Sequence, residues 1–381
     1  MTAAGDDATL RQQLGCWVHE RWRTEAALRL GGGRWRGLCN RGDRLVAVPG
    51  GGPGAGRECR WDHSRELTVA RVFPRIGARL LAVAVPEIPL RWDGPPPATQ
   101  SAEEPAVSVL VPVGGADRRA TAAICLAALS AEAAAYAATS DGELGNGGPG
   151  GGEPGGGAEI VLAEQRAPGE PPADAPDGVR RVRVDDGGPF NKSRLLNRAA
   201  EVARGKVLVV HDVDLLPTRG YLRRCAAAVA EADAARPGRL IFYLNEATTA
   251  RLVAADRPTA WHPGAECGGG ECLSVERVVQ NSPNPTVVRR EAYFELGGHD
   301  ESFEGWGGED LEFLSRLRTR PTNEFGTEPL VHLWHPPAPK KASGHRNDRL
   351  QAERLAEPPA NRIRRLRGRL GGAAAEEVGQ C

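Results

Sequence analysis

The sequence predicts an α/β fold in which helices flank both faces of a mostly parallel sheet. Between Val107 and Leu244, short β-branched runs alternate with helical patterns, which is the order that builds parallel βαβ units. The chain has 381 residues and 40% hydrophobic content, enough to bury a large core. Residues 1–103 differ in composition, and their fold is not predictable from the pattern.

Each predicted element has its own local signal. Strands are expected where apolar, β-branched residues cluster: Val107–Val111, Ile160–Leu162, Val179–Val184, Lys206–Val210 and Leu240–Leu244. Helices are expected over Arg119–Thr139, Ser193–Arg204 and Tyr221–Ala235, and from about Leu311 onward. Gly205 is predicted to follow the second of these helices in the C′ position. The segment Gly142–Gly157 is dominated by glycine and is predicted to be a disordered insertion.

Three regions follow from these patterns: 1–103, an α/β domain over 104–355, and a helical or flexible tail over 356–381. Within the first region, Leu45–Val48 is apolar, Leu80–Val85 has a β-like pattern, and Pro95–Pro97 indicates a linker. The pairs Cys16/His19 and Cys59/His63 lack the pattern of a zinc module, so structural zinc is not favoured.

Charge and composition exclude some classes of partner. The 49 basic and 49 acidic residues balance, which gives no reason to expect nucleic acid or an anionic membrane. No apolar run is expected to reach the ~20 residues of a transmembrane helix, and the polar N-terminus is unlike a secretory signal. A cytoplasmic location is therefore predicted, with the Golgi lumen as the alternative if an anchor is missing from this sequence.

Eight scattered cysteines do not form a disulfide scaffold, and free thiols are favoured. Cys125 and Cys225 lie in apolar helical patterns and are predicted to be core thiols. Cys267 and Cys272 flank a glycine run and could pair in an oxidising compartment.

Two aspartates directly follow an apolar strand, in the run Asp212-Val213-Asp214. If the segment is extended, alternate side chains share a face and both carboxylates point to one place. Ligands bind at the carboxyl ends of strands in such sheets, and carboxylates there suit Mg²⁺ or Mn²⁺ carrying a diphosphate. Asp-x-Asp also occurs by chance in loops, so the motif alone leaves both interpretations open.

His332 and His335 follow a second apolar piece, Leu330-Val331. Two imidazoles three residues apart can meet at one cation together with a carboxylate, a donor set suited to Mn²⁺. The alternative is a pair of surface or hydrogen-bonded histidines in a proline-rich loop. The basic residues that follow are more typical of a solvated surface than of a phosphate site: Lys340, Lys341, His345 and Arg346.

Glu309 and Asp310 stand where a helical pattern begins, behind the loop Gly305-Trp306-Gly307-Gly308. We expect this loop to be anchored by Trp306 and able to move. Acids in a first helical turn lie near the positive end of the helix dipole, which favours their ionised form, and a carboxylate so placed suits a general base. Such acids are also common as simple decoration of a helix N-terminus.

The run from Phe190 to Asn197 opens the helix before the Asp-x-Asp strand. Lys192 and Arg194 lie near the helix N-terminus, where backbone N–H groups also favour anions. Asn191 could instead cap the helix.

Four blocks in this order resemble the catalytic domain of the β-1,4-galactosyltransferase family: Glu164-Gln165, Phe190 to Asn197, Asp212 to Pro217, and Gly305 to Asp310. The stretch from Asn284 to Gly298 also resembles related bacterial and chondroitin-type glycosyltransferases. The likeness covers about Val107 to Arg346. It implies a GT-A fold, a requirement for Mn²⁺ or another divalent cation, and transfer of a sugar from a UDP-sugar to a glycan or similar acceptor with inversion.

The resemblance also implies residue roles. Asp310 matches the catalytic base, and Glu309 and Trp306 match the donor and acceptor pocket, with Gly307 and Gly308 allowing loop closure. Asp214 and His335 match metal-binding positions, while His332 falls where the animal enzymes often have methionine. Asp212 matches a position near the donor sugar. Phe190 and Lys192 match nucleotide-contacting positions, Lys192 standing where the family usually has arginine, and Arg194 lies beside them.

Two departures from the family pattern affect specificity. The family's nucleotide-binding Pro-Phe-Arg-Asn-Arg run is replaced by Pro112 to Arg118, so base and ribose contacts must differ. Leu311 replaces a carboxylate that helps to hold an N-acetylated acceptor, which puts N-acetylglucosamine in doubt. Alternatives are a processive or peptide-directed transferase, a degenerate protein that binds a nucleotide sugar or glycan without catalysis, and a metal-dependent hydrolase.

Overall fold

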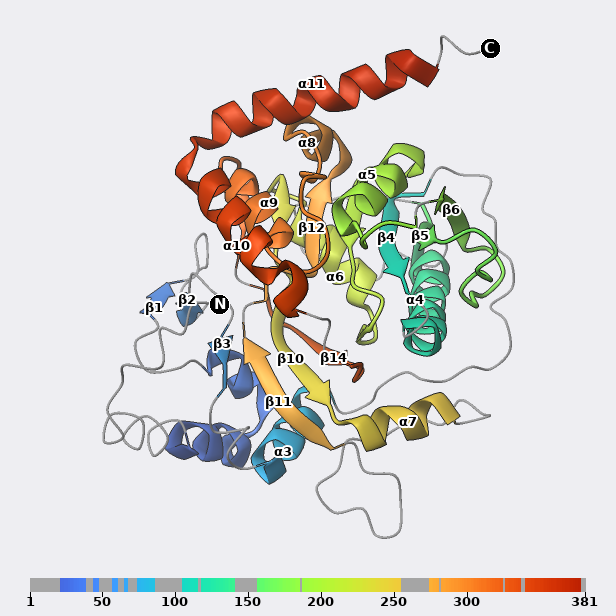
Figure 1. Cartoon of the computed structure of the whole chain (residues 1–381). Helices are drawn as coiled ribbons and strands as arrows, with labels where there is room; N and C mark the ends of the chain where they lie inside the picture. The colour runs from blue at the N-terminus through green and yellow to red at the C-terminus, as the bar shows by residue number, and fades with distance from the viewer. Residues whose placement is uncertain are drawn as a thin grey trace.

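The structure is a computed structural model that describes residues 21–38, 44–47, 57–60, 65–67, 74–85, 105–115, 118–140, 156–185, 187–254, 274–280, 282–324, 326–336 and 340–377. Its helices are η1 (Gly32–Gly37), α3 (Pro74–Ala84), α4 (Arg119–Ser140), α5 (Lys192–Val202), α6 (Tyr221–Ala228), α7 (Glu246–Ala254), α8 (Arg290–Glu295), α9 (Glu309–Leu317), α10 (Lys340–Ala356) and α11 (Pro359–Glu377). Its strands are β1 (Arg44–Ala47), β2 (Arg57–Arg60), β3 (Arg65–Glu66), β4 (Val107–Gly114), β5 (Ala158–Arg166), β6 (Arg180–Asp185), β7 (Val207–Val210), β8 (Leu215–Leu216), β9 (Ala234–Ala235), β10 (Gly238–Leu244), β11 (Val275–Gln280), β12 (Thr286–Arg289), β13 (Thr322–Asn323) and β14 (Glu328–His332). Figure 1 shows their arrangement.

A seven-stranded sheet holds the elements predicted from the alternating pattern. Its order is β13-β9-β12-β7-β4-β5-β6. The neighbours β7, β4, β5 and β6 run parallel, as do β9 and β13, while β12 is antiparallel to both of its neighbours. The mostly parallel α/β sheet expected for a GT-A fold is therefore confirmed.

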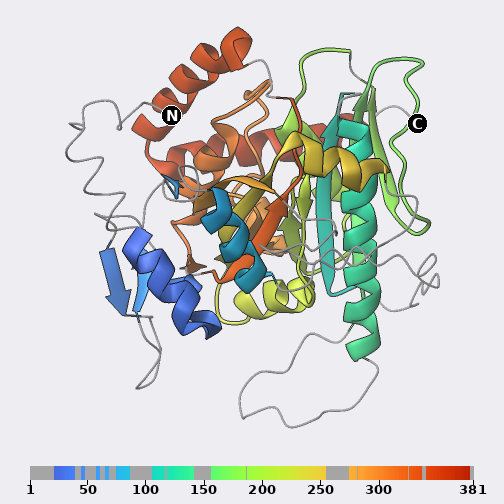
Figure 2. The same cartoon turned by 90° about the horizontal axis from the view of Figure 1, so that it is seen from below.

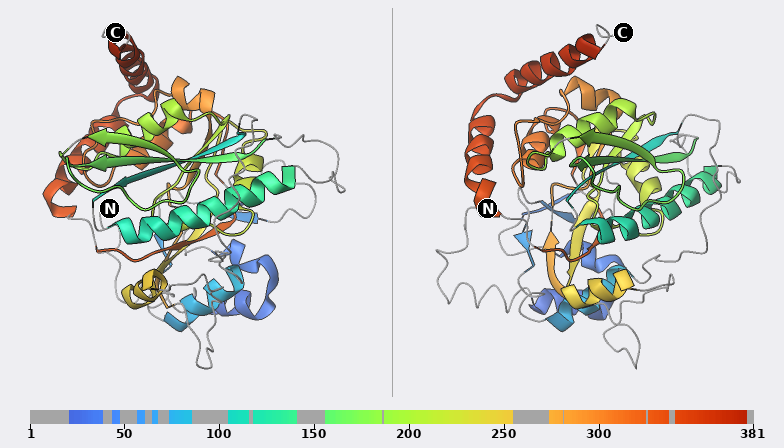
Figure 3. Two further views of the ribbon diagram at one scale, coloured as in Figure 1. Left: turned by 90° about the vertical axis from the view of Figure 1, so that its right-hand side faces the viewer. Right: turned by 45° about the vertical axis from the view of Figure 1, so that its right-hand side comes forward.

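Both faces of this sheet are covered, because successive residues of β4 enter different cores. Val109 and Val111 pack in one buried cluster with Leu126 of α4. Leu110 between them packs in a second cluster with Leu195 of α5. Figure 3 shows α4 and α5 on opposite sides of the strands. This alternation explains why consecutive residues from Val109 to Val111 are all apolar, instead of every second one.

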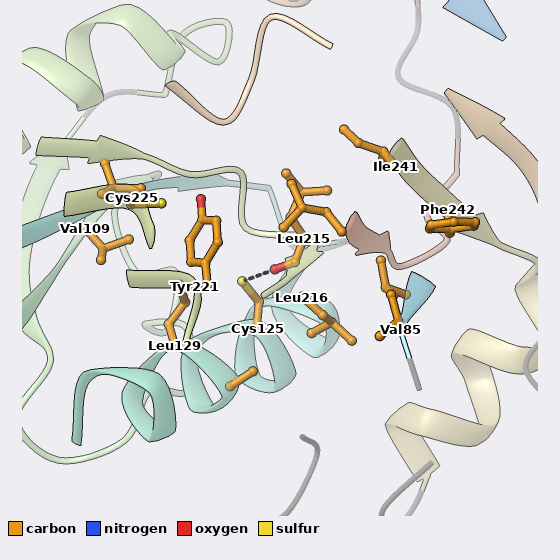
Figure 4. Packing of buried hydrophobic residues seen from close by; sticks show 14 of the residues in the cluster. Val85, Val109, Cys125, Leu129, Leu215, Leu216, Tyr221, Cys225, Ile241 and Phe242 are labelled. Atoms are coloured by element: carbon orange, nitrogen blue, oxygen red, sulfur yellow. Dashed lines mark hydrogen bonds between the residues drawn. The ribbon is translucent and has the colours of Figure 1, made fainter. Parts of the chain in front are cut away.

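The larger of the two cores contains both cysteines that were predicted to be core thiols. Cys125 and Cys225 are buried free cysteines. Figure 4 shows the Cys125 thiol donating a 3.0 Å hydrogen bond to the backbone oxygen of Leu215, close to Tyr221. The contact ties α4 to the chain segment just after the Asp-x-Asp run.

A second sheet, of order β3-β11-β10-β14-β8, lies beside the first. The short strand β8 pairs antiparallel with β14, placing Leu215 opposite His332 and Leu216 opposite Val331. This pairing brings the segment after Asp214 next to the strand that ends in His332. The two sequence motifs are thereby joined across more than a hundred residues.

The described part of the N-terminal region packs on this second sheet. Strand β3 pairs with β11, and Leu80 and Leu81 of α3 are buried in the larger core. Figure 2 shows α3 against this side of the molecule. The β-like interpretation of Leu80–Val85 was wrong: the buried positions Ile76, Leu80 and Leu81 follow the spacing of a helix instead.

Two other local predictions are corrected by tertiary contacts. Helix α6 ends at Ala228, not at Ala235, because Ala234 and Ala235 form β9 and pair with β12. Gly205 does not adopt a left-handed conformation. It approaches β4 so closely that an added Cβ would lie 2.6 Å from the backbone nitrogen of Ser108.

Helix α4 contains the window Arg119–Ala138, which has the length and mean hydropathy, 1.5, of a membrane-spanning helix. The expectation that no apolar run reaches this length was therefore wrong, because alanines extend the run. Within the protein 56% of the window is buried, and core helices meet the same criterion.

Several predicted features lie outside the described residues. They are most of the insertion Gly142–Gly157, the linker Pro95–Pro97, the side chains of Cys59, Lys340, Lys341 and His345, and the residues Cys16, His19, Cys39, His63, Cys267, Cys272 and Cys381.

Candidate active site

Lys192 joins the Asp-x-Asp run to the Glu309-Asp310 pair. Its Nζ lies 2.7 Å from Oδ1 of Asp212, 3.1 Å from each carboxylate oxygen of Asp310, and 3.9 Å from Oε1 of Glu309. Lys192 is buried in the protein. The structure therefore brings together four of the predicted site residues around one ammonium group, which we call the acid–lysine cluster.

Local hydrogen bonds place Lys192 at the start of α5. Asn191 caps this helix, its side-chain oxygen accepting from the backbone N–H of Arg194 at 2.9 Å, so the capping interpretation is confirmed. The backbone N–H of Asn191 donates in turn to the side chain of Gln165 at the end of β5, at 2.8 Å. Arg194 lies in the first turn of the same helix, and its role in donor binding stays a prediction.

Asn284 belongs to the acid–lysine cluster and was missed as a site residue. Its side-chain amide donates to Oδ1 of Asp310 at 3.0 Å and to the two oxygens of Asp212 at 3.3 and 3.4 Å. It is buried and lies just before β12. A buried amide that bridges two carboxylates fixes their separation. A stretch that resembles other glycosyltransferases begins at Asn284, but no local pattern assigned this residue to the site, since its partners are 72 and 26 residues away.

Burial opposes the ionised form of the two acids that begin α9. It is the main cause that raises the pKa of Asp310, with Lys192 acting in the opposite direction. Burial also raises the pKa of Glu309 to about 8, and the neighbouring Asp310 adds to this effect. The helix dipole was expected to favour ionisation, but desolvation exceeds it here. For Asp212, burial acts upward as well, yet the adjacent Lys192 brings its pKa below the ordinary value.

The raised pKa of Glu309 predicts a specific dependence of stability on pH. Between its ordinary value of 4.5 and about 8, the unfolded chain has released a proton that the folded chain keeps. The contribution of Glu309 to the free energy of unfolding therefore falls as pH rises through this window. We expect Glu309→Gln to gain stability relative to the wild type as pH rises from about 5 to about 8, measured by urea denaturation.

The matched control is Glu276→Gln, at an exposed position of β11, whose stability relative to the wild type should not change with pH. A difference between Glu309→Gln and wild type that stays constant over the window would contradict the assignment.

Asp214, His332 and His335 form a second cluster with the donors of a metal site. Nε2 of His332 lies 3.5 Å from Oδ1 of Asp214, and Nε2 of His335 lies 3.4 Å from Oδ2. All three potential ligand atoms lie within 4.8 Å of one another. Burial lowers the pKa of His332, which keeps its imidazole neutral and able to bind a cation. One carboxylate oxygen and two imidazole nitrogens fit Mn²⁺ or a similar divalent ion.

The two aspartates of the Asp-x-Asp run do not converge on one spot. Strand β7 ends at Val210, and the backbone then turns, with the N–H of Leu215 donating to the oxygen of Asp212 at 3.1 Å. Because the segment is a turn and not an extended strand, Asp212 faces the acid–lysine cluster and Asp214 faces the histidines. Arg118, from the loop after β4, pairs with Asp214.

Backbone hydrogen bonds hold the loop Gly305–Gly308 in place. The indole is 49% exposed. The backbone N–H of Gly305 donates to the oxygen of Phe190 at 2.7 Å, and the buried Asn347 of α10 donates to the oxygens of Glu304 and Trp306 at 2.9 and 3.1 Å. Gly308 has a φ of 95° and touches Phe303 so closely that an added Cβ would lie 2.7 Å from its ring. These backbone contacts fix the course of the loop on both sides of Gly305.

A shallow hollow lies at the carboxyl ends of β4 and β5. Its lining includes Gly114, Gly115, Arg119, Gln165 and Glu170. The ring of Phe190 covers Gly114, where an added Cβ would lie 2.5 Å from it. Glycine at this position is required for Phe190 to pack over the end of β4.

Comparison with known proteins supports the resemblance to glycosyltransferases. Residues 180–329 match a family model described as glycosyltransferase like family 2. The matched region contains Asp212, Asp214, Glu309 and Asp310, and it ends before His332. No curated protein matches the chain.

Solved glycosyltransferase structures are similar at low identity. The catalytic domain of Drosophila β1,4-galactosyltransferase 7 with xylobiose is 16% identical, with a TM-score of 0.28 over 57% of this chain and 63% of that one. A mutant of the same enzyme with manganese, UDP-Gal and xylobiose is 16% identical, with a TM-score of 0.31 over 63% and 72%. GalNAc-T7 with UDP, GalNAc and Mn²⁺ is 13% identical, with a TM-score of 0.36 over 61% and 45%.

Proposed function

We propose that the protein is an inverting, metal-dependent glycosyltransferase. It moves a hexose or an N-acetylhexosamine, in the manner of a galactosyltransferase, from a UDP-sugar to a hydroxyl group of a glycan or other acceptor. One observation carries the proposal: the turn from Asp212 to Asp214 contributes a carboxylate to each cluster. A candidate proton acceptor, Asp310, and a candidate cation site are thereby held on either side of one short turn.

In this mechanism Asp310 is the general base. It accepts the proton of the acceptor hydroxyl as that oxygen bonds to the anomeric carbon and the bond from this carbon to the diphosphate oxygen breaks. Lys192, 3.1 Å from both carboxylate oxygens, favours the ionised form before transfer, and burial favours the protonated form after it. Asn284 keeps Asp310 and Asp212 at a fixed separation. A divalent cation held by Asp214, His332 and His335 would neutralise the charge that develops on the departing UDP.

We place the donor nucleotide over the shallow hollow beside Phe190, not inside it. The hollow adjoins Lys192 through Asn191 and Gln165, and it lies at the sheet edge where ligands of parallel α/β folds bind. Gly114 and Gly115 project no side chains where the family's arginine-containing run would, and the ring of Phe190 covers Gly114 instead. This supports a contact between the nucleobase of the donor and the walls of the hollow, which include Arg119 and Glu170.

Incubation of the full chain with Mn²⁺ and a panel of UDP-sugars tests the proposal. UDP release should require both Mn²⁺ and a sugar acceptor, and EDTA should abolish it. Release that is independent of any acceptor would indicate a hydrolase. Tight UDP binding without release would indicate a binding protein, and either outcome would overturn the proposed function.

Asn347 is expected to set the position of the Trp306 loop. Replacement by alanine removes two hydrogen bonds that hold backbone oxygens on both sides of Gly305, each worth about 1 kcal/mol. Because positioning errors of about 1 Å reduce turnover strongly, we expect kcat to fall by roughly tenfold. Mn²⁺ binding should be unaffected, since the metal cluster is made elsewhere.

The control is Arg349→Ala, at an exposed position on the same helix, which should retain wild-type kcat. Acrylamide quenching of Trp306 fluorescence, taken as the difference from a Trp306→Phe variant, should change only in Asn347→Ala. Unchanged kcat and quenching would show that the loop does not depend on this amide.

A further inference from the structure

Three neighbouring strands place an arginine, a tyrosine and a histidine in one row across the second sheet. Strand β10 lies between β11 and β14. In this register Tyr243 stands opposite Arg277 on one side and opposite His332 on the other. Residues directly across from one another in a sheet share a face, so the three side chains can stack in sequence.

The side chains do stack. The rings of Tyr243 and His332 have centroids 4.1 Å apart and an interplanar angle of 21°. The guanidinium carbon of Arg277 lies 4.1 Å from the centroid of the Tyr243 ring. His332 is thus held on its ring face by Tyr243, which is itself held by Arg277.

The two histidines of the metal cluster are oriented in different ways. Nδ1 of His335 lies 2.7 Å from the backbone oxygen of Pro336, a hydrogen bond that leaves Nε2 unprotonated toward Asp214. Nδ1 of His332 is buried and makes no hydrogen bond to any residue in the described part of the chain. Ligand histidines are usually oriented by a hydrogen bond at the second nitrogen. For His332 the ring stack takes that role.

We propose that Tyr243 is a positioning residue for His332, which keeps Nε2 of this imidazole directed at the cation site beside Asp214. The inference rests on the metal site of the proposed function. Tyr243 acts through the face of its ring, which stacks on the imidazole of His332. Arg277 is exposed on β11, the strand on the other side of β10 from His332, and its guanidinium group holds the Tyr243 ring in place.

Binding of Mn²⁺ alone to the full chain, followed by electron paramagnetic resonance, tests this role without any activity assay. Tyr243→Phe retains the ring and should bind Mn²⁺ within about twofold of wild type. Tyr243→Leu removes the stack and should weaken Mn²⁺ binding by about tenfold, the lower end of the effect of losing a residue that orients a ligand. Arg277→Gln should have a smaller effect in the same direction.

A double-variant cycle separates positioning from a general structural effect. In a His332→Ala background, Tyr243→Leu should cause no further loss of Mn²⁺ affinity, because the residue through which it acts is gone. The inference about Tyr243 would be overturned, and the metal site would stand, if Tyr243→Leu bound Mn²⁺ as tightly as wild type. An undiminished loss of Mn²⁺ affinity in the His332→Ala background would have the same consequence. A wild-type chain that binds no Mn²⁺ would overturn the metal site and this inference together.

Discussion

Replacement of Asp310 by asparagine should lower sugar transfer by about 10²- to 10⁴-fold, the range typical for loss of a general base. The amide has nearly the shape of the carboxylate but cannot accept the acceptor's proton. Asp310 touches Lys192 and Asn284 and none of the three metal-cluster residues in the hydrogen bonds and ion pairs of the described chain. Binding of UDP and Mn²⁺ should therefore stay within a few-fold of wild type.

The measurement is steady-state kcat with the preferred UDP-sugar, together with calorimetric binding of UDP. Asp348→Asn makes the same change at an exposed position on α10. It is the matched control and should leave kcat and UDP binding unchanged. If Asp310→Asn turned over at a near-normal rate while Glu309→Gln did not, the base would be Glu309. Normal rates in both variants would remove this carboxylate pair from the mechanism.

Replacement of Glu312 by alanine should destabilise the protein by about 3–5 kcal/mol, since it leaves buried charge without a partner. Glu312 lies in α9, two residues after Asp310, and is 0% exposed. Its carboxylate accepts hydrogen bonds from Arg316 at 2.6 Å and from Arg362 of α11 at 2.6 Å. Arg316 is itself 0% exposed and Arg362 is 1% exposed. Two guanidinium groups would thus lose their only carboxylate among the described ion pairs.

Urea denaturation measures this effect, and Arg364→Ala on the exposed side of α11 is the control, with an expected change below about 0.5 kcal/mol. The loss of stability in Arg362→Met should lie between those of Glu312→Ala and Arg364→Ala, because Glu312 then keeps its ion pair with Arg316. A loss below about 1 kcal/mol for Glu312→Ala would show that these ion pairs contribute little. The expected result makes α11 a support of the helix that carries Asp310, as its position across α8 and α9 in Figure 1 suggests.

The sequence predicted local elements well where a short-range apolar pattern decides the conformation. Strands β4, β5, β6, β7 and β10 and helices α4, α5 and α9 lie where the apolar patterns placed them. It was wrong where a neighbour decided the conformation. Ala234 and Ala235 leave the predicted helix because β12 offers them a strand partner, and Gly205 serves close contact with Ser108 instead of a left-handed turn.

The site residues also divide into those that a local motif predicts and those that depend on distant partners. Asp212, Asp214, Asp310, His332 and His335 were visible because each sits in a short motif at the end of a strand or the start of a helix. Asn284 and Tyr243 were not visible, because an asparagine before a proline and a tyrosine in a strand are ordinary locally. Their significance depends on partners 72 and 89 residues away, Asp212 for Asn284 and His332 for Tyr243.

The sequence by itself therefore determined the α/β class, the carboxylates and histidines available for chemistry, and the resemblance that orders them. These features follow from side-chain type and from periodicity along the chain. Only the tertiary structure decided that Asp212 and Asp214 serve separate clusters, that burial raises the pKa of Asp310 and Glu309, and that Lys192 joins them. The physical reason is that desolvation and charge pairing depend on what surrounds a group in space, and Lys192 and Asp310 are 118 residues apart in the chain.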